Sequence, residues 1–134
     1  MCIVLTTSPE LKISLDLVRT EDRVPSVAFN LLVEVNMPFQ QSRVSANECW
    51  FKHEALNRFE DQLADLRSTE GGTATLSDMS DRPVLRVIRV GNEIKTTVRT
   101  TDTMQMETTV VEVHGYASEI AVLWEQLRSY EKWW

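Results

Sequence analysis

The chain has 134 residues, of which 43% are hydrophobic and 25% are charged, and this balance is typical of a globular protein with a single core. The formal net charge of -6 argues against a nucleic-acid partner, because phosphates bind basic surfaces, and it suits a basic protein partner as well as simple solubility. No apolar run reaches the roughly 20 residues that a membrane-spanning helix needs, and the first ten residues lack the features of a signal peptide. Two cysteines do not make a disulfide framework, so we expect a reducing, cytoplasmic compartment. The length predicts one domain over residues 1–134, and the lack of a long apolar run predicts no membrane partner.

Two segments near the start of the chain alternate between apolar and polar residues, which predicts half-buried strands. In residues 11–18 the apolar face consists of Leu11, Ile13, Leu15 and Leu17. In residues 26–35 it consists of Phe29, Leu31, Val33 and Val35, and this second strand is expected at the centre of the sheet. Residues 43–50 alternate poorly and predict a third, less regular strand, while the pattern at residues 3–5 leaves a further strand open.

Residues 52–67 have the pattern of an amphipathic helix that lies on the sheet. Apolar side chains recur at steps of three and four, at Leu56, Phe59, Leu63 and Leu66. The opposite side of the helix carries Glu54, Asn57, Arg58, Asp61 and Asp65. No usual capping residue precedes the helix, and the pair Gly71-Gly72 closes the helical region.

Residues 84–100 predict a β-hairpin whose turn is Gly91-Asn92, because a Gly-Asn pair between two β-branched runs is a known turn signal. With a two-residue turn, Val90 faces Glu93, and the core face consists of Leu85, Val87, Ile94, Thr96 and Val98. The other face carries three basic residues, which we interpret as a solvent face that discourages pairing with another strand edge; they are Arg86, Lys95 and Arg99. Residues 73–76 and 106–115 predict further strands on either side of the hairpin.

A second amphipathic helix follows, with Ser118 as its expected cap and with an apolar stripe formed by Ile120, Leu123, Leu127 and Tyr130. The chain ends in Trp133 and Trp134, which are expected to fold back over the sheet, a partner or homodimer contact being the alternative. These elements predict an α+β fold with one antiparallel, curved sheet of about six strands packed with two helices. The order strands–helix occurs twice, without a repeat at the level of residues.

Catalytic and metal-binding motifs are absent from the sequence: it has no phosphate-binding loop, dinucleotide fingerprint, nucleophile elbow or zinc-protease motif. Four residues could ligate a soft metal, but their spacing is unlike that of structural zinc sites; they are Cys2, Cys49, His53 and His114. A packed thiol is the expected state of Cys49, in preference to a Cys–His nucleophile pair. We therefore predict no catalytic residue, no metal and no cofactor.

From residue 44 onward, the order of these signals resembles that of the WapI-type immunity proteins and related uncharacterised bacterial domains. The matching residues are Trp50 before the first helix, Glu54, Leu56, Phe59, Leu63 and Leu66 within it, Gly72, Ala74 and Leu76 after it, then Leu85, Val87, Gly91, Ile94, Thr96, Val111 and Val113, and finally Leu123 and Leu127 in the last helix. The resemblance implies a small cytoplasmic protein with an antiparallel sheet and two helices, which protects a bacterium from a toxin and has no catalytic motif. The segment leading into the last helix is Gly115-Tyr116-Ala117-Ser118, where the family often has a polar Gln or Asp, and this difference leaves open a relative with another role.

The leading expectation for function is a non-enzymatic binding protein of immunity type that binds and neutralises a toxin. The predicted partner-binding residues are Glu54, Asp61 and Asp65, because they share one acidic helix face that would attract the basic surface of a toxin domain. An exposed helix face lacks the enclosed pocket that acid–base catalysis requires, so an enzyme ranks third. The alternative to a toxin binder is a small-ligand-binding or regulatory module with a pocket between sheet and helices.

Overall fold

The computed structural model describes residues 2–7, 10–102 and 107–130. Trp133 and Trp134, for which the sequence predicts a contact with the sheet, lie outside the described residues. In chain order the elements are β1 (Cys2–Thr6), β2 (Leu11–Glu21), β3 (Ser26–Met37), β4 (Gln40–Lys52), α1 (His53–Leu66), β5 (Gly71–Ser77), β6 (Pro83–Val90), β7 (Glu93–Asp102), β8 (Glu107–Tyr116) and α2 (Ser118–Arg128).

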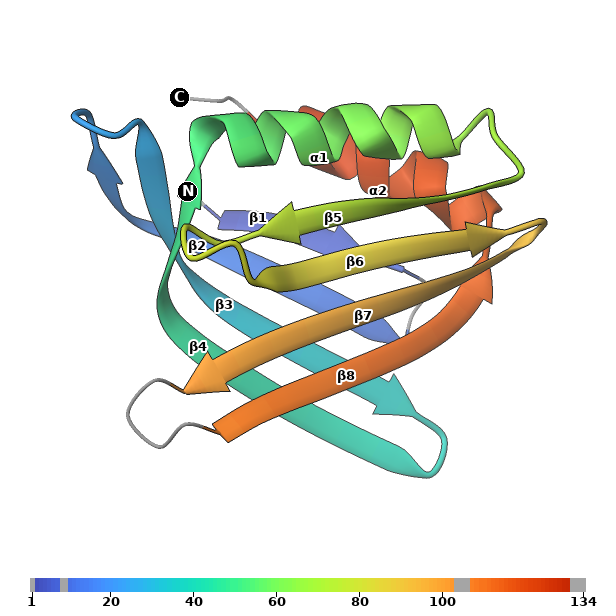
Figure 1. The fold of residues 1–134 in the computed structure, drawn as a ribbon. Coiled ribbons are helices and arrows are strands. Elements are labelled where there is room, and N and C mark those ends of the chain that lie inside the picture. Colours follow the sequence, from blue (N-terminus) through green and yellow to red (C-terminus); the bar gives the residue numbers. More distant parts are fainter. Residues whose placement is uncertain (1, 8–9, 103–106, 131–134) are drawn as a thin grey trace.

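The strands form two four-stranded antiparallel sheets, so the expected α+β class is correct but the prediction of a single sheet of about six strands is wrong. Sheet 1 has the order β1-β2-β3-β4 and sheet 2 the order β5-β6-β7-β8. Figure 1 shows the two sheets facing each other with their strands crossing, and both helices lying at one end. The prediction fails because alternation reports which face of a strand is buried and carries no information about which strands pair. Helix α1 separates β4 from β5, and each half then completes its own sheet, with β1 as the strand that the sequence left open.

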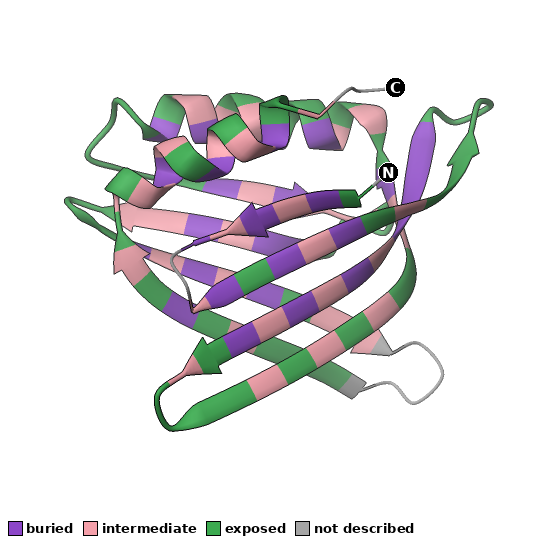
Figure 2. Ribbon diagram, turned by 180° about the vertical axis from the view of Figure 1, so that it is seen from behind, coloured by how far each residue is buried: buried purple, intermediate pink, exposed green. Residues whose placement is uncertain are grey.

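The predicted periodicities correspond to the observed cores of the elements. All four stripe residues of α1 are buried, and the same holds for the apolar face of β3, which is an inner strand of sheet 1. Buried residues alternate with partly buried or exposed ones along residues 11–16 of β2 and 29–35 of β3 (Figure 2). Helix α1 begins after Lys52 without a side-chain cap, as expected. Helix α2 differs, because Ala117 occupies its cap position without a side-chain hydrogen bond, so the prediction of Ser118 as the cap is wrong.

The hairpin of β6 and β7 has the predicted register. Val90 pairs with Glu93 and Leu85 pairs with Val98 across the turn. Gly91 has a φ of 62°, and Asn92 is not among the residues with positive φ. A positive φ at the first central residue alone is the pattern of a type II′ turn, whose twist matches that of the flanking strands. The register places Leu85, Val87, Ile94, Thr96 and Val98 in the core, as predicted.

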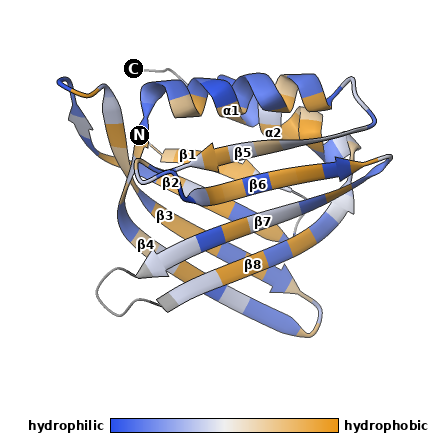
Figure 3. Cartoon of the chain, in the orientation of Figure 1, coloured by the Kyte–Doolittle hydropathy of each residue, from blue (hydrophilic) through white to orange (hydrophobic). Residues whose placement is uncertain are grey.

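Buried apolar side chains from both sheets and both helices form one cluster that fills the interior. Within it, the rings of Phe29 on β3 and Phe51 on β4 lie 6.2 Å apart and are tilted by 49°, a favourable arrangement for an aromatic pair. The helices turn their apolar sides toward the sheets and their hydrophilic sides outward (Figure 3). No helix in the described ranges has the length and apolar character needed to cross a membrane.

Each helix covers the edge strand of the sheet that belongs to the other half of the chain. Helix α1 follows sheet 1 and packs against β5, whereas α2 follows sheet 2 and packs against β1. Oε1 of Gln62 on α1 accepts a hydrogen bond from the backbone N–H of Thr75 on β5 at 2.9 Å. Oε1 of Gln126 on α2 accepts one from the backbone N–H of Thr6 on β1, also at 2.9 Å. The two halves are therefore similar in arrangement, and the helices join them crosswise.

Candidate functional site

The three predicted partner-binding residues form an acidic stripe along the outward side of α1. Glu54, Asp61 and Asp65 are all exposed. Their spacing of seven and four residues places them on one line along the helix, and Arg58 lies on the same line. Nη2 of Arg58 lies 3.4 Å from Oε1 of Glu54, and both side chains are mostly exposed. Such an exposed pair adds little to stability, so the stripe consists of three solvated carboxylates and one guanidinium.

The four candidate soft-metal ligands lie on different elements. Cys2 is exposed on β1, Cys49 is partly buried on β4, His53 begins α1, and His114 lies on the outward face of β8, where its Nε2 is 3.1 Å from Oε1 of Glu112. Within the described residues, no group of three His, Cys, Asp or Glu side chains could hold a metal ion. Burial raises the pKa of the Cys49 thiol, and the nearby Asp78 carboxylate raises it further. A raised pKa disfavours the thiolate, which is the nucleophilic form of cysteine.

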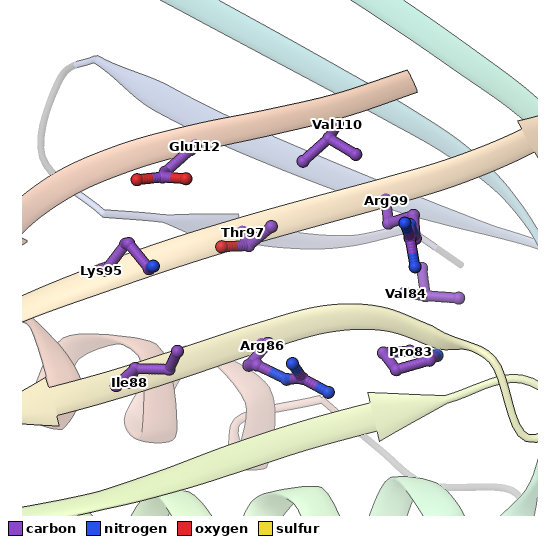
Figure 4. Close-up of a pocket in the computed structure, with 9 residues that line it drawn as sticks. All are labelled: Pro83, Val84, Arg86, Ile88, Lys95, Thr97, Arg99, Val110 and Glu112. Atoms are coloured by element: carbon purple, nitrogen blue, oxygen red, sulfur yellow. The ribbon is translucent and has the colours of Figure 1, made fainter. Parts of the chain in front are cut away.

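A second charged surface lies on the outward face of sheet 2, where a groove of about 320 Å³ runs across β6, β7 and β8 (Figure 4). Arg86 on β6, Thr97 on β7 and Glu112 on β8 form one row across the three strands. Lys95 and Arg99 lie two positions to either side of Thr97 on β7, so their side chains share its face of the sheet. We call this site the basic groove, after its three cations Arg86, Lys95 and Arg99.

The cations of the basic groove form no ion pair within the described part of the chain. Glu112, the carboxylate in the same row as Arg86, instead contacts His114. The Nε atom of Arg86 is buried and has no hydrogen-bond acceptor among the described residues. A buried donor without an acceptor costs free energy, and native proteins contain few of them. This donor therefore distinguishes the groove from an ordinary solvated surface.

The prediction that the cations of the basic groove prevent a strand edge from pairing with another chain is wrong. The edges of sheet 2 are β5 and β8, whereas Arg86, Lys95 and Arg99 lie on its two inner strands, β6 and β7. An inner strand has a neighbour on each side and exposes no backbone edge that could pair with another chain. The alternation within the hairpin indicated a basic face, but its central position in the sheet depends on strand order, which the alternation does not report.

No family model matches the sequence, and comparisons with curated proteins and with solved structures give no match either. The resemblance to WapI-type immunity proteins therefore stays a prediction. The described part of the protein has two candidate functional surfaces, the acidic stripe of α1 and the basic groove of sheet 2.

Proposed function

We propose that this protein is a non-enzymatic binding protein of immunity type, which binds a basic protein toxin and blocks it. The observation that carries the proposal is the acidic stripe of α1, where Glu54, Asp61 and Asp65 are exposed on one line of a helix. The net charge of -6 adds to the attraction that a basic partner would experience. Toxins that attack nucleic acid need basic surfaces to contact phosphate, and an acidic inhibitor can cover such a surface.

The acidic stripe is well placed for fast association because its helix is firmly anchored. Four buried side chains fix α1 from below; they are Leu56, Phe59, Leu63 and Leu66. The carboxylates of Asp61 and Asp65 form no ion pair among the described residues, so they are available to a partner. Charges held on a rigid element steer a partner of opposite charge without a further cost of ordering the backbone.

The alternative, a ligand pocket between sheet and helices, has less support. Apolar side chains from both sheets and both helices fill that space as one cluster. Two of the buried polar residues, Thr7 and Thr96, contribute only a hydroxyl group to the interior. A binding pocket for a small polar ligand needs several convergent polar groups in a concave site.

The test is co-expression with any toxin that a neighbouring gene encodes, followed by measurement of association at low and high salt. Charge reversal of the stripe with Glu54→Lys, Asp61→Lys and Asp65→Lys should slow association by about tenfold or more at low salt. It should change the free energy of unfolding by less than about 0.5 kcal/mol for each substitution, because all three side chains are exposed. A matched control reverses three exposed acids of β2 and its following turn; these are Asp16, Glu21 and Asp22.

Two results would contradict the proposal at different levels. Absence of protection from the toxin would refute the immunity function. Protection with equal association rates for the stripe variant and the control variant would keep the immunity function but remove the acidic stripe as its contact. The next surface to test would then be the outward face of sheet 2, where Val90 and Tyr116 are 74% and 69% exposed.

A further inference from the structure

The arrangement of the three cations in the basic groove follows from the register of sheet 2. Arg86 is paired with Thr97, so Lys95 and Arg99 are its two diagonal neighbours on β7. Diagonal neighbours on one face of an antiparallel pair are about 7–8 Å apart. A single oxyanion can contact Arg86 and one of these neighbours. Lys95 and Arg99 are four residues apart, about 13 Å along β7, so contact with all three cations requires an ion with two linked phosphoryl groups on which the long side chains converge. The hydroxyl group of Thr97 lies between them and can add one donor.

The groove concentrates positive charge in a protein that is acidic as a whole. Three cations without an ion pair repel one another across neighbouring positions, which disfavours the arrangement in the absence of an anion. The buried Nε–H of Arg86 adds a donor that has no acceptor in the described part of the protein. An oxyanion in the groove would neutralise the repulsion, and the guanidinium fork of Arg86 matches phosphate geometry particularly well.

We propose that the basic groove binds a compact polyanion of the pyrophosphate class, either the free ion or the diphosphate part of a small molecule. The volume of about 320 Å³ fits a small ligand and lies at the lower end of the usual range for small-molecule sites. This inference is independent of toxin binding, because it concerns the opposite charge on a different element.

The surroundings of the groove favour a compact ligand over an extended one. Ile88 and Val110 line the groove beside the cations and form no strong interaction with phosphate. Glu112 lies at its β8 side and Glu93 lies further along β7, so a long polyanion would extend over negative charge. The chain as a whole carries a net charge of -6, which repels nucleic acid and acidic polypeptides along their length. A diphosphate can be confined to the three cations.

The experiment is a titration of the ¹⁵N-labelled full chain with inorganic pyrophosphate, followed by the backbone amide signals and by the arginine Nε–H signals. We expect saturable shifts at β6, β7 and β8, and a shift at Nε–H of Arg86, because its guanidinium gains a charged partner. Arg86→Gln should weaken binding by about tenfold or more, the effect of losing a hydrogen bond to a charged group. Arg99→Gln should weaken it similarly and serves as the second variant, since its side chain is exposed and is not required for packing.

The matched control is Arg43→Gln, which removes the same charge from the exposed outward face of sheet 1 and should change the affinity by less than about twofold. The proposal is refuted if pyrophosphate causes no saturable shift at about 10 mM, or if Arg43→Gln weakens binding as much as Arg86→Gln does. Two further titrations test the ligand class. Tighter binding of a single-stranded oligonucleotide or of a hexaglutamate peptide than of pyrophosphate would also refute it, because the site would then serve an extended polyanion.

Discussion

Gln62 of α1 and Gln126 of α2 occupy equivalent places in the two halves of the molecule. Each glutamine directly precedes a buried leucine of its helix, Leu63 or Leu127. Each accepts a hydrogen bond from the backbone of an edge strand in the opposite sheet. Exposed strand edges invite pairing with other chains, and proteins often cover them with a helix. The two glutamines therefore satisfy edge groups that the sheets themselves leave without a partner.

Replacement of either glutamine should leave one backbone N–H of an edge strand, that of Thr75 or of Thr6, without its acceptor. Gln62→Leu and Gln126→Leu keep the approximate size of the side chain but remove the acceptor, and each should lower the free energy of unfolding by at least about 1 kcal/mol. Gln126→Leu also removes the donor to Oγ1 of Thr6 at 2.8 Å, so its loss should be the larger. The two losses should add, because the sites lie on different helices and share no partner. Chemical denaturation measures the stability, and amide hydrogen exchange identifies the affected edge.

The two variants serve as controls for each other. Gln62→Leu should accelerate exchange at Thr75 and leave Thr6 unchanged, and Gln126→Leu should do the reverse. Equal acceleration at both amides in either variant would mean that the helix as a whole has loosened and that the glutamine is not a specific cover.

Leu63→Ala should destabilise the fold by about 2–4 kcal/mol. The Leu63 side chain is fully buried near the middle of the α1 stripe, so its truncation removes apolar burial and leaves a cavity in the shared core. Urea denaturation with an unchanged m-value would isolate the effect on stability. A loss of less than about 1 kcal/mol would show that the core collapses around the smaller side chain.

Gly91→Ala should destabilise the hairpin of sheet 2 by about 1–2 kcal/mol. The φ of 62° is unfavourable for a residue with a Cβ atom, although no heavy atom lies within 4 Å of the place where that atom would be. The cost thus comes from the local backbone, where Cβ approaches the neighbouring carbonyl oxygen, and not from contact with other parts of the fold. Asn92→Ala, at the neighbouring position without a positive φ, is the control and should have a smaller effect on thermal stability. Equal losses for the two variants would contradict the type II′ assignment.

Glu119→Gln should raise stability at neutral pH. Burial raises the pKa of the Glu119 carboxyl above its ordinary value, a hydrogen bond from the Tyr116 backbone opposes this shift, and the Glu10 carboxylate adds to it. Because the folded-state pKa is higher than the unfolded-state pKa, the folded protein loses stability as the pH rises through the interval between the two. Below that interval the wild type and the variant should have similar stability.

Denaturation curves measured on both sides of the ordinary carboxyl pKa test this expectation. The advantage of Glu119→Gln should grow as the pH rises and should then stay constant above the raised pKa. Glu125→Gln, an exposed carboxyl of the same helix, is the matched control for the loss of one negative charge. An advantage for Glu119→Gln that is the same at all pH values would point to packing as its cause.

Local patterns in the sequence were sufficient to predict both helices, the hairpin register and the buried faces of the strands. The apolar spacing of α1 and the turn at Gly91 are encoded within a few neighbouring residues, so their consequences could be derived without knowledge of the rest. The number of sheets could not be derived in this way. It depends on whether β4 pairs with β5 after α1, and nothing in their alternation distinguishes the two outcomes.

The two candidate surfaces also differ in how far the sequence alone could predict them. The acidic stripe is a property of one helix, so the exposure of Glu54, Asp61 and Asp65 was predictable from spacing alone. The basic groove requires three strands in a known order, because Arg86 on β6 and Lys95 on β7 lie on inner strands and Glu112 of β8 ends the row that starts at Arg86. The alternation of the sequence correctly predicted that the cations share one face. It did not show that they lie on inner strands, so the predicted role at a strand edge was wrong.

The cover that α2 provides for β1 joins opposite ends of the chain. The hydroxyl oxygen of Tyr130, just after α2, accepts a hydrogen bond from the backbone N–H of Val4 at 3.2 Å. The corresponding pair, α1 and β5, is connected by the short segment 67–70. A circular permutant could therefore link the end of α2 to β1 and open the chain between α1 and β5. It would keep every strand pairing, and its chain would still consist of two successive units of four strands followed by a helix.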